Sequence, residues 1–461
     1  MLLALRFFSV DDLVLAPLCL AILYAIIRNK ANKNHDPQIR KIYYRGFYFK
    51  VICVLAYTFV SEFIFKGGDT NLYFQGVKDL RAAVNDDFNH AGTIVKSLKL
   101  TMDNPLTPYF YYDNYADDFT YNYMTNVSNF FIPRLGLIPA VLFFNNYLCI
   151  NFIFGFFALG GAIRLFKTFH HYYPSYTSEL VLATIFLPSV GFWSSGLLKD
   201  TICFGSVGFI LYAVLNIFVK KTKIRVSVIL IVACGFLIYY IKVYILLVLI
   251  LAILIWLFAE TNKLISDKTL RNIFSFITLA VSFLIGFFLL NYFTSQEAAQ
   301  NYKLETLMEK ADYQRRVIQN LSETATLGSN FSINTSNPVT LVPNSLVATF
   351  FRPFLWEVNS PVAFFSAVES AILLFLTLFF FFKRGIGNFF RMAFADPRLL
   401  MCFVFAIIFA VAVGASTSNF GALSRYKIPC MPFYFIMLLL LYKKASLPYP
   451  KWFDRIVNLL K

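Results

Sequence analysis

The stretch Phe350-Phe-Arg-Pro-Phe-Leu-Trp-Glu-Val-Asn-Ser360 places Arg352 and Glu357 among bulky aromatic residues, immediately before a long apolar run that begins near Pro361. Trp and Phe anchor comfortably at a membrane–water boundary, and a charge there costs little if it faces a wet cavity. Two interpretations of Arg352 are open. It is either a plain anchor that reaches lipid phosphate or part of a site, and the choice depends on what else lies on the same side of the membrane.

The composition of the whole chain is typical of a helical membrane protein. The 461 residues are 58% hydrophobic and include 55 Phe and 27 Tyr. Apolar runs repeatedly reach the roughly 17–25 residues that cross a bilayer. The seven Cys and four His show neither a Cys-x-x-Cys pair nor a metal-ligand spacing, so no disulfide framework or metal site is predicted. The predicted fold class is all-α, a polytopic transmembrane helix bundle that forms a single integral membrane domain over residues 1–461.

Hydropathy along the chain predicts about eleven spans. They fall at roughly 12–28, 46–65, 147–165, 179–197, 201–219, 226–240, 243–260, 273–291, 362–382, 398–414 and 427–443.

The distribution of charge predicts the orientation of these spans. With the N-terminus outside and the C-terminus inside, the short cytoplasmic loops hold most of the Lys and Arg, and the exterior segments are nearly neutral. The formal net charge of +16 therefore reflects membrane orientation and does not indicate nucleic-acid binding. The cytoplasmic loops are too short for a nucleotide-binding domain, and the chain has no phosphate-binding Gly-rich loop.

Two larger segments, about 66–130 and 292–360, are placed on the exterior face by this topology. Each is predicted to contain an amphipathic helix, over 77–100 and 303–321 respectively. Residues 131–146 are apolar but interrupted by Pro, which favours a re-entrant or surface helix over another crossing.

Six motifs with charged or polar residues fall at the exterior boundary. They are Gly67-Gly-Asp69-Thr70, Phe192-Trp-Ser-Ser-Gly-Leu-Leu-Lys199-Asp200, Tyr239-Tyr-Ile-Lys242-Val-Tyr244, the Arg352–Glu357 stretch, Glu369, and Ser418-Asn419-Phe-Gly-Ala-Leu-Ser-Arg425-Tyr426-Lys427. Each has a structural alternative, such as a turn residue at Lys242 or a helix cap at Lys199–Asp200. Glu369 is different, because a carboxylate inside a span is costly unless it is paired or faces water.

Taken together, the motifs indicate a site for a lipid-linked pyrophosphate. The cations Lys199, Lys242, Arg352, Arg425 and Lys427 share one face with Asp69, Asp200 and Glu357. Guanidinium groups bind two phosphate oxygens at once, and cations stabilise a departing diphosphate. A carboxylate takes the proton of an attacking sugar hydroxyl. We therefore predict catalytic roles for Asp69 and Glu357. Substrate-binding roles are predicted for Lys199, Asp200, Lys242, Arg352, Asn419, Arg425 and Lys427.

The same motifs resemble those of bacterial exopolysaccharide and O-antigen polymerases of the EpsG/Wzy type, which belong with the C-type (GT-C) membrane glycosyltransferases. The resemblance rests on Gly-Asp69-Thr, Trp-Ser-Ser-Gly…Lys199-Asp200, Arg352-Pro-Phe-x-Trp-Glu357 and Asn419-Phe-Gly…Arg425-Tyr-x-x-Pro. It implies transfer of a glycan from an undecaprenyl-pyrophosphate carrier to a sugar hydroxyl at the periplasmic face of the bacterial inner membrane. Asp69 would then be the acidic residue of the first loop, although it follows the second predicted span and the C-type pattern puts that residue after the first.

The sequence thus favours a polysaccharide polymerase with a lipid-linked oligosaccharide as partner, alongside membrane lipids and other polysaccharide-export components. No nucleic-acid partner and no cofactor are indicated, although exterior carboxylates could recruit a divalent metal. The alternative is a transporter or flippase of lipid-linked saccharides, which should place ionisable groups near the bilayer midplane.

Overall fold

The protein is helical throughout the part that we describe in this computed structural model. The structure describes residues 6–65, 68–111, 119–261, 338–358, 360–417 and 419–460, with scattered positions between 267 and 284. It is 81% helical and contains no strand among those residues. The all-α prediction is therefore confirmed. The amphipathic helix predicted over 303–321 and nearly all of the predicted span 273–291 lie outside the described residues.

The chain divides into two compact units. The first comprises Met1–Ile163, Gly191–Phe209 and Val232–Lys242, and the second comprises Arg164–Val190, Ile210–Ile231 and Val243–Lys461.

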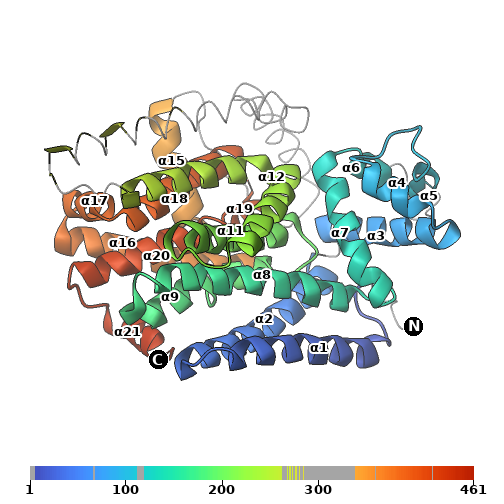
Figure 1. The fold of residues 1–461 in the computed structure, drawn as a ribbon, viewed down its shortest axis with the longest axis horizontal. Helices are drawn as coiled ribbons and strands as arrows, with labels where there is room; N and C mark the ends of the chain where they lie inside the picture. Colours follow the sequence, from blue (N-terminus) through green and yellow to red (C-terminus); the bar gives the residue numbers. More distant parts are fainter. Residues whose placement is uncertain are drawn as a thin grey trace. The chain divides into compact units, whose positions relative to one another are not determined.

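The helices that supply the first unit are α1 (Asp12–Asn32), α2 (Pro37–Phe63), α3 (Asp69–Asp86), α4 (His90–Lys96), α5 (Thr107–Tyr111), α6 (Phe119–Met124), α7 (Val127–Leu142), and parts of α8 (Tyr147–His170), α10 (Pro188–Trp193), α11 (Lys199–Val214) and α12 (Ile224–Thr261). Helix α1 packs beside α2, and α3 packs beside α7 (Figure 1). The second unit takes the remaining parts of α8, α10, α11 and α12, together with η1 (Pro174–Tyr176), α9 (Thr177–Thr184), the π-helical turn η2 (Leu215–Val219), α15 (Pro338–Phe351), η5 (Leu355–Glu357), α16 (Pro361–Arg384), α17 (Ile386–Ala395), α18 (Pro397–Ser416), α19 (Phe420–Tyr426), α20 (Met431–Lys444) and α21 (Lys451–Asn458).

Within the described ranges, seven helices are long and apolar enough to cross a membrane. They are Asp12–Asn32, Pro37–Phe63, Tyr147–His170, Lys199–Val219, Ile224–Phe258, Pro361–Arg384 and Pro397–Ser416. Helix α1 is apolar on both faces: one face, with Cys19, Leu23 and Ile27, is buried, and Leu13 and Val14 on the other face are 78% and 70% exposed. A long helix with apolar residues on all sides is suited to lipid.

The remaining predicted spans take other forms. Residues 179–197 hold the two short helices α9 and α10, and α20 at the predicted span 427–443 has 14 residues. The predicted spans 226–240 and 243–260 are joined in α12, which is interrupted by the non-helical backbone of Lys242 (φ −151°, ψ 77°). The total of eleven crossings therefore stays a prediction.

Three of the long helices begin with the same local signal. Asp36, Ser360 and Asp396 each accept a hydrogen bond from a backbone N–H of the first turn, and each precedes a proline at the first helical position. A side-chain cap satisfies an N–H group that has no partner in the helix, and proline lacks that group altogether. These caps set where α2, α16 and α18 begin.

Predicted exterior segments are also helical. The first contains α3 and α4, so the helix predicted over 77–100 begins earlier, at Asp69, and breaks after Asp86. Helix α7 covers most of the Pro-interrupted stretch 131–146 and has 16 residues. It ends before Phe144 and Asn145, whose φ angles of 52° and 59° terminate the helix.

Glycines allow α8 and α11 to pack closely inside the first unit. A Cβ atom on Gly161 would lie 2.3 Å from the carbonyl oxygen of Gly205, which is far inside van der Waals contact. Small residues at such a crossing let helix backbones approach in membranes. The two helices therefore depend on glycine here.

Replacing Gly161 with alanine should destabilise the protein by about 1–3 kcal/mol, because the added methyl group forces the two backbones apart. Gly235→Ala in α12 is the matched control, since a Cβ there meets nothing within 4 Å. Thermal unfolding of both variants in detergent measures the difference. Equal stability of the two variants would contradict the close crossing.

Candidate functional site

The turn between α15 and α16 holds Arg352 and Glu357 as a bonded pair. Nε of Arg352 donates to both carboxylate oxygens of Glu357 at 3.1 Å, and the guanidinium forms a further, shorter bond through Nη2. The same carboxylate accepts the backbone N–H of Phe354 at 2.8 Å. Both side chains are partly exposed, at 21% and 17%. The pair is therefore preorganised while both groups can still meet a ligand.

Aromatic rings surround this pair. The guanidinium carbon of Arg352 lies 5.1 Å from the ring centre of Phe420 and 5.9 Å from that of Phe354. Phe354 in turn stacks on Trp356, which is 80% exposed. An exposed Trp beside a charged turn is typical of a membrane boundary, and the boundary position of this turn stays a prediction.

Beneath the turn, Lys427 is completely buried and holds the backbone of Arg352. Its ammonium donates to the carbonyl oxygen of Arg352 at 3.2 Å and to Oγ of Ser370 at 2.9 Å. The Ser370 hydroxyl donates to the same carbonyl at 3.2 Å. Lys427 was predicted to bind substrate, and in the structure its ammonium faces the protein backbone.

The inner face of α16 is polar over its first half. Glu369 accepts the backbone N–H of Ser189 at 2.8 Å and its hydroxyl at 2.5 Å, and the hydroxyls of Ser366 and Ser424 lie 2.8 Å apart. Ser366, Glu369 and Ser370 are three and four residues apart along α16, so they lie on one face of that helix. Glu369 is 7% exposed, so its carboxylate is a buried and hydrogen-bonded group, as its intramembrane position requires.

Asn419 and Arg425 lie at the two ends of α19 in this unit. Oδ1 of Asn419 caps the helix by accepting the N–H groups of Gly421 at 2.7 Å and Ala422 at 3.3 Å. Arg425 donates to the hydroxyl of Tyr426 at 3.2 Å and is partly exposed. The structure thus gives Asn419 a capping role and leaves Arg425 partly exposed, with its Nε buried.

In the first unit, Lys242 and Asp200 form a buried ion pair. Nζ of Lys242 lies 2.5 Å from Oδ1 of Asp200, and the two side chains are 9% and 0% exposed. Asp200 is in the first turn of α11, where a negative charge suits the helix dipole. Lys242 is the non-helical residue of α12, so the pair fixes the break in that helix to the start of α11.

Lys199 and Asp69 complete the predicted set in this unit. Lys199 donates to Oγ of Ser128 at 2.7 Å and to Oδ1 of Asn129 at 2.5 Å, which ties α11 to α7. Asp69 begins α3 and is partly exposed. Both side chains are partly exposed. The substrate-binding role of Lys199 and the catalytic role of Asp69 stay predictions.

The structure therefore pairs Arg352 with Glu357 in the second unit and Lys242 with Asp200 in the first. Other predicted residues bond serine or asparagine side chains, as Lys199, Glu369 and Lys427 do. Sequence reasoning missed their partners Ser128, Asn129, Ser189 and Ser370, because isolated Ser and Asn residues carry no signal until a fold puts them beside a charge. Among the described residues, no group of His, Cys, Asp or Glu side chains is arranged to hold a metal ion.

The pKa of Glu357 follows from its surroundings. Partial burial by itself raises the pKa, but the hydrogen bonds from Arg352 and from the Phe354 N–H, with the charge of Arg352, hold it below its ordinary value. Glu357 is therefore ionised at neutral pH. This is the state that a general base requires, although a low pKa also makes the carboxylate a weaker base.

A group with a lowered pKa in the folded state stabilises the fold above its unfolded pKa and loses that contribution as the pH falls through the folded value. We expect wild type to exceed Glu357→Gln in stability by about 0.5–1 kcal/mol at neutral pH, since the pair is partly exposed. The difference should persist to about pH 4.3, the unperturbed value for Glu, and disappear below it. Thermal unfolding of both proteins from pH 6 to pH 3 measures this. If the stability difference between the two proteins were already lost above pH 5, the lowered pKa of Glu357 would be contradicted.

These features define a class: the chain is a multi-pass helical membrane protein, with charged pairs held at helix ends. No protein-family model, curated protein or solved structure matches the chain.

Proposed function

We propose that this protein is a membrane glycosyltransferase of the polysaccharide-polymerase type. It would use an undecaprenyl-pyrophosphate-linked glycan as donor and a sugar hydroxyl as acceptor, at the periplasmic face of a bacterial inner membrane. The observation that carries the proposal is the Arg352–Glu357 pair: a guanidinium bonded to a carboxylate, partly exposed and flanked by aromatic rings, immediately before a membrane-spanning helix.

The pair suits a lipid-linked pyrophosphate for physical reasons. A guanidinium binds two phosphate oxygens in a fixed geometry, and Glu357 already holds that of Arg352 in place. Lys427 and Ser370 hold the backbone carbonyl of Arg352 from below, so we assign Lys427 the role of positioning the turn. Preorganised charge of this kind stabilises a leaving group without rearrangement during the reaction.

In the proposed reaction, the acceptor hydroxyl oxygen attacks the anomeric carbon of the donor. The bond from that carbon to the pyrophosphate oxygen breaks, and the lipid pyrophosphate leaves with the bonding electrons. The hydroxyl proton passes to a carboxylate, for which Asp69 and Glu357 are the candidates. Because its bonds to Arg352 weaken Glu357 as a base, we favour Glu357 for orienting the guanidinium.

A transporter of lipid-linked saccharides is the second candidate. Two ionisable side chains, Lys50 in α2 and Glu369 in α16, are buried inside spanning helices at 7% exposure each. Such groups are common along substrate paths in transporters. In this structure Glu369 is hydrogen-bonded to Ser189 and Lys50 to backbone and serine oxygens, which accounts for their burial without a transport role.

Reconstitution of the pure protein in liposomes with a lipid-linked repeat unit tests the proposal. Polymerase activity requires that new glycosidic bonds and released lipid pyrophosphate appear together and in equal amounts. Movement of labelled lipid between leaflets without either product would establish the transporter instead. Empty liposomes and liposomes with heat-unfolded protein are the controls.

A further inference from the structure

Lys50 is a buried cation that the proposed reaction does not use. It lies in the middle of α2 and is 7% exposed. Within the part of the chain that the structure describes, none of the ion pairs involves Lys50. A charge in such a place is costly unless dipoles or an opposite charge replace its hydration.

The replacement comes from oxygen atoms in the last turn of α10 and in the residues just after it. Nζ of Lys50 lies 3.0 Å from the carbonyl oxygen of Gly191, 2.8 Å from Oγ of Ser194, 3.3 Å from Oγ of Ser195 and 3.4 Å from the carbonyl oxygen of Ser194. These two carbonyls belong to the last turn of α10 and the residue after it, where helix carbonyls lack partners and the dipole is negative.

The hydroxyl of Ser195 is oriented to accept. It donates its own hydrogen to the carbonyl of Gly191 at 2.6 Å, which leaves its lone pairs toward the ammonium. Lys50 therefore meets a cage of neutral oxygens, which is how broken helices in membranes coordinate monovalent cations.

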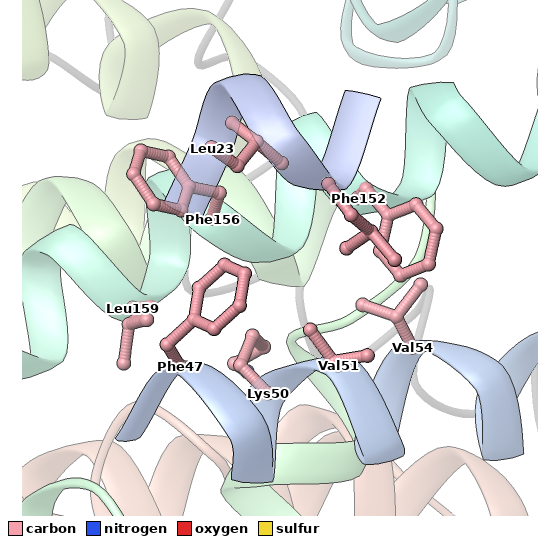
Figure 2. Close-up of a pocket in the computed structure, with 9 residues that line it drawn as sticks. Leu23, Phe47, Lys50, Val51, Val54, Phe152, Phe156 and Leu159 are labelled. Carbon is pink, nitrogen blue, oxygen red and sulfur yellow. The ribbon is translucent and has the colours of Figure 1, made fainter. Parts of the chain in front are cut away.

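The rest of the Lys50 side chain lies against an apolar wall. Figure 2 shows its stem in a small pocket between α1, α2 and α8, with Leu23, Val54 and Phe156 among the residues that line it. The site thus separates the side chain into an apolar stem and a cationic head held by oxygen atoms.

We propose that the Gly191–Ser195 segment is a monovalent-cation site whose resident cation is the ammonium of Lys50. The tethered cation holds α2 to the break after α10, and it does so without depending on the proposed reaction. Removing the side chain should therefore create a site that accepts a free cation of the same chemistry.

Lys50→Ala opens the cage, and propylammonium is the fragment that this substitution deletes. We expect the thermal midpoint of the variant to fall by about 5 °C in cation-free detergent buffer. Propylammonium should restore most of that loss in a saturable manner, as binding to the folded state requires. Potassium, which is close to ammonium in size, is the inorganic probe and should restore part of it.

Three controls separate site binding from a general salt effect. Tetramethylammonium carries the same charge without an N–H group and should not restore Lys50→Ala. Lys50→Met fills the pocket without a charge and should not respond to propylammonium. Adding Ser194→Ala to Lys50→Ala removes the nearest oxygen of the cage and should weaken the response several-fold.

If Lys50→Ala yields no folded protein without added cations, Lys50→Ser takes its place. This variant also opens the cage, and it leaves a short polar side chain. Recovery of either folded variant only with propylammonium or potassium would support the site. Failure of every added cation to restore both variants would overturn it. An equal response to tetramethylammonium would overturn it as well.

Discussion

Arg352→Ala should lower the rate of glycan chain growth by about 10²–10³-fold, which is the usual cost of removing one preorganised donor to a developing negative charge. The guanidinium is held by two bonds from Nε to Glu357 and is partly exposed. Its loss removes the group proposed to receive the departing pyrophosphate. Single-turnover assays that follow both the new glycosidic bond and the released lipid pyrophosphate measure the effect.

Two further variants sharpen this result. Arg352→Lys keeps the charge without the planar fork and should give an intermediate rate. Arg384→Ala is the matched control, because Arg384 is the last residue of α16 and bonds the carbonyl of Ala445, at the opposite end of that helix from the Arg352 turn. Chain growth that survives Arg352→Ala at the wild-type rate would remove the donor-binding role of this residue.

Lys242→Met should lower the free energy of unfolding by about 3–5 kcal/mol, because it leaves the Asp200 carboxylate charged and buried without its partner. The two side chains are 9% and 0% exposed, and their charged atoms lie 2.5 Å apart. The Lys242→Met/Asp200→Asn double variant removes both charges and should be more stable than Lys242→Met alone. Reversible unfolding in mixed micelles measures all three proteins.

A neighbouring lysine supplies the control for this pair. Lys199 is less buried than Lys242 and bonds the side chains of Ser128 and Asn129, so Lys199→Met should cost less, about 1 kcal/mol. Chain growth by the double variant then tests the predicted substrate role of Lys242 and Asp200. A stable double variant with wild-type growth would show that the pair is structural, and equal losses for Lys199→Met and Lys242→Met would contradict the buried ion pair.

Several features of the fold follow from the order of residues alone. Long apolar runs predict where the spanning helices lie, and in the structure caps such as Asp36-Pro37 and Ser360-Pro361 set where α2 and α16 begin. The requirement that backbone groups be satisfied within the membrane leaves a helix as the outcome for such a run.

Other features could not be read in this way. The run 179–197 is apolar enough for a span but is divided into α9 and α10, and the charge in α2 gives no hint that its partners lie at the end of α10 and just after it. A hydrophobicity average reports whether a segment prefers lipid, and it carries no information about which distant oxygens can replace the hydration of a buried charge.

For the candidate site, the sequence by itself determined that Arg352 and Glu357 stand together at the start of a spanning helix, since both belong to one short turn. Only the tertiary structure decided that Lys427 holds that turn from below and that Lys242 is neutralised by Asp200. The physical reason is the distance along the chain over which each interaction acts. Caps and hydrophobic runs act between neighbours in the chain, whereas a buried charge must find a partner in three dimensions, wherever the packing of helices puts one.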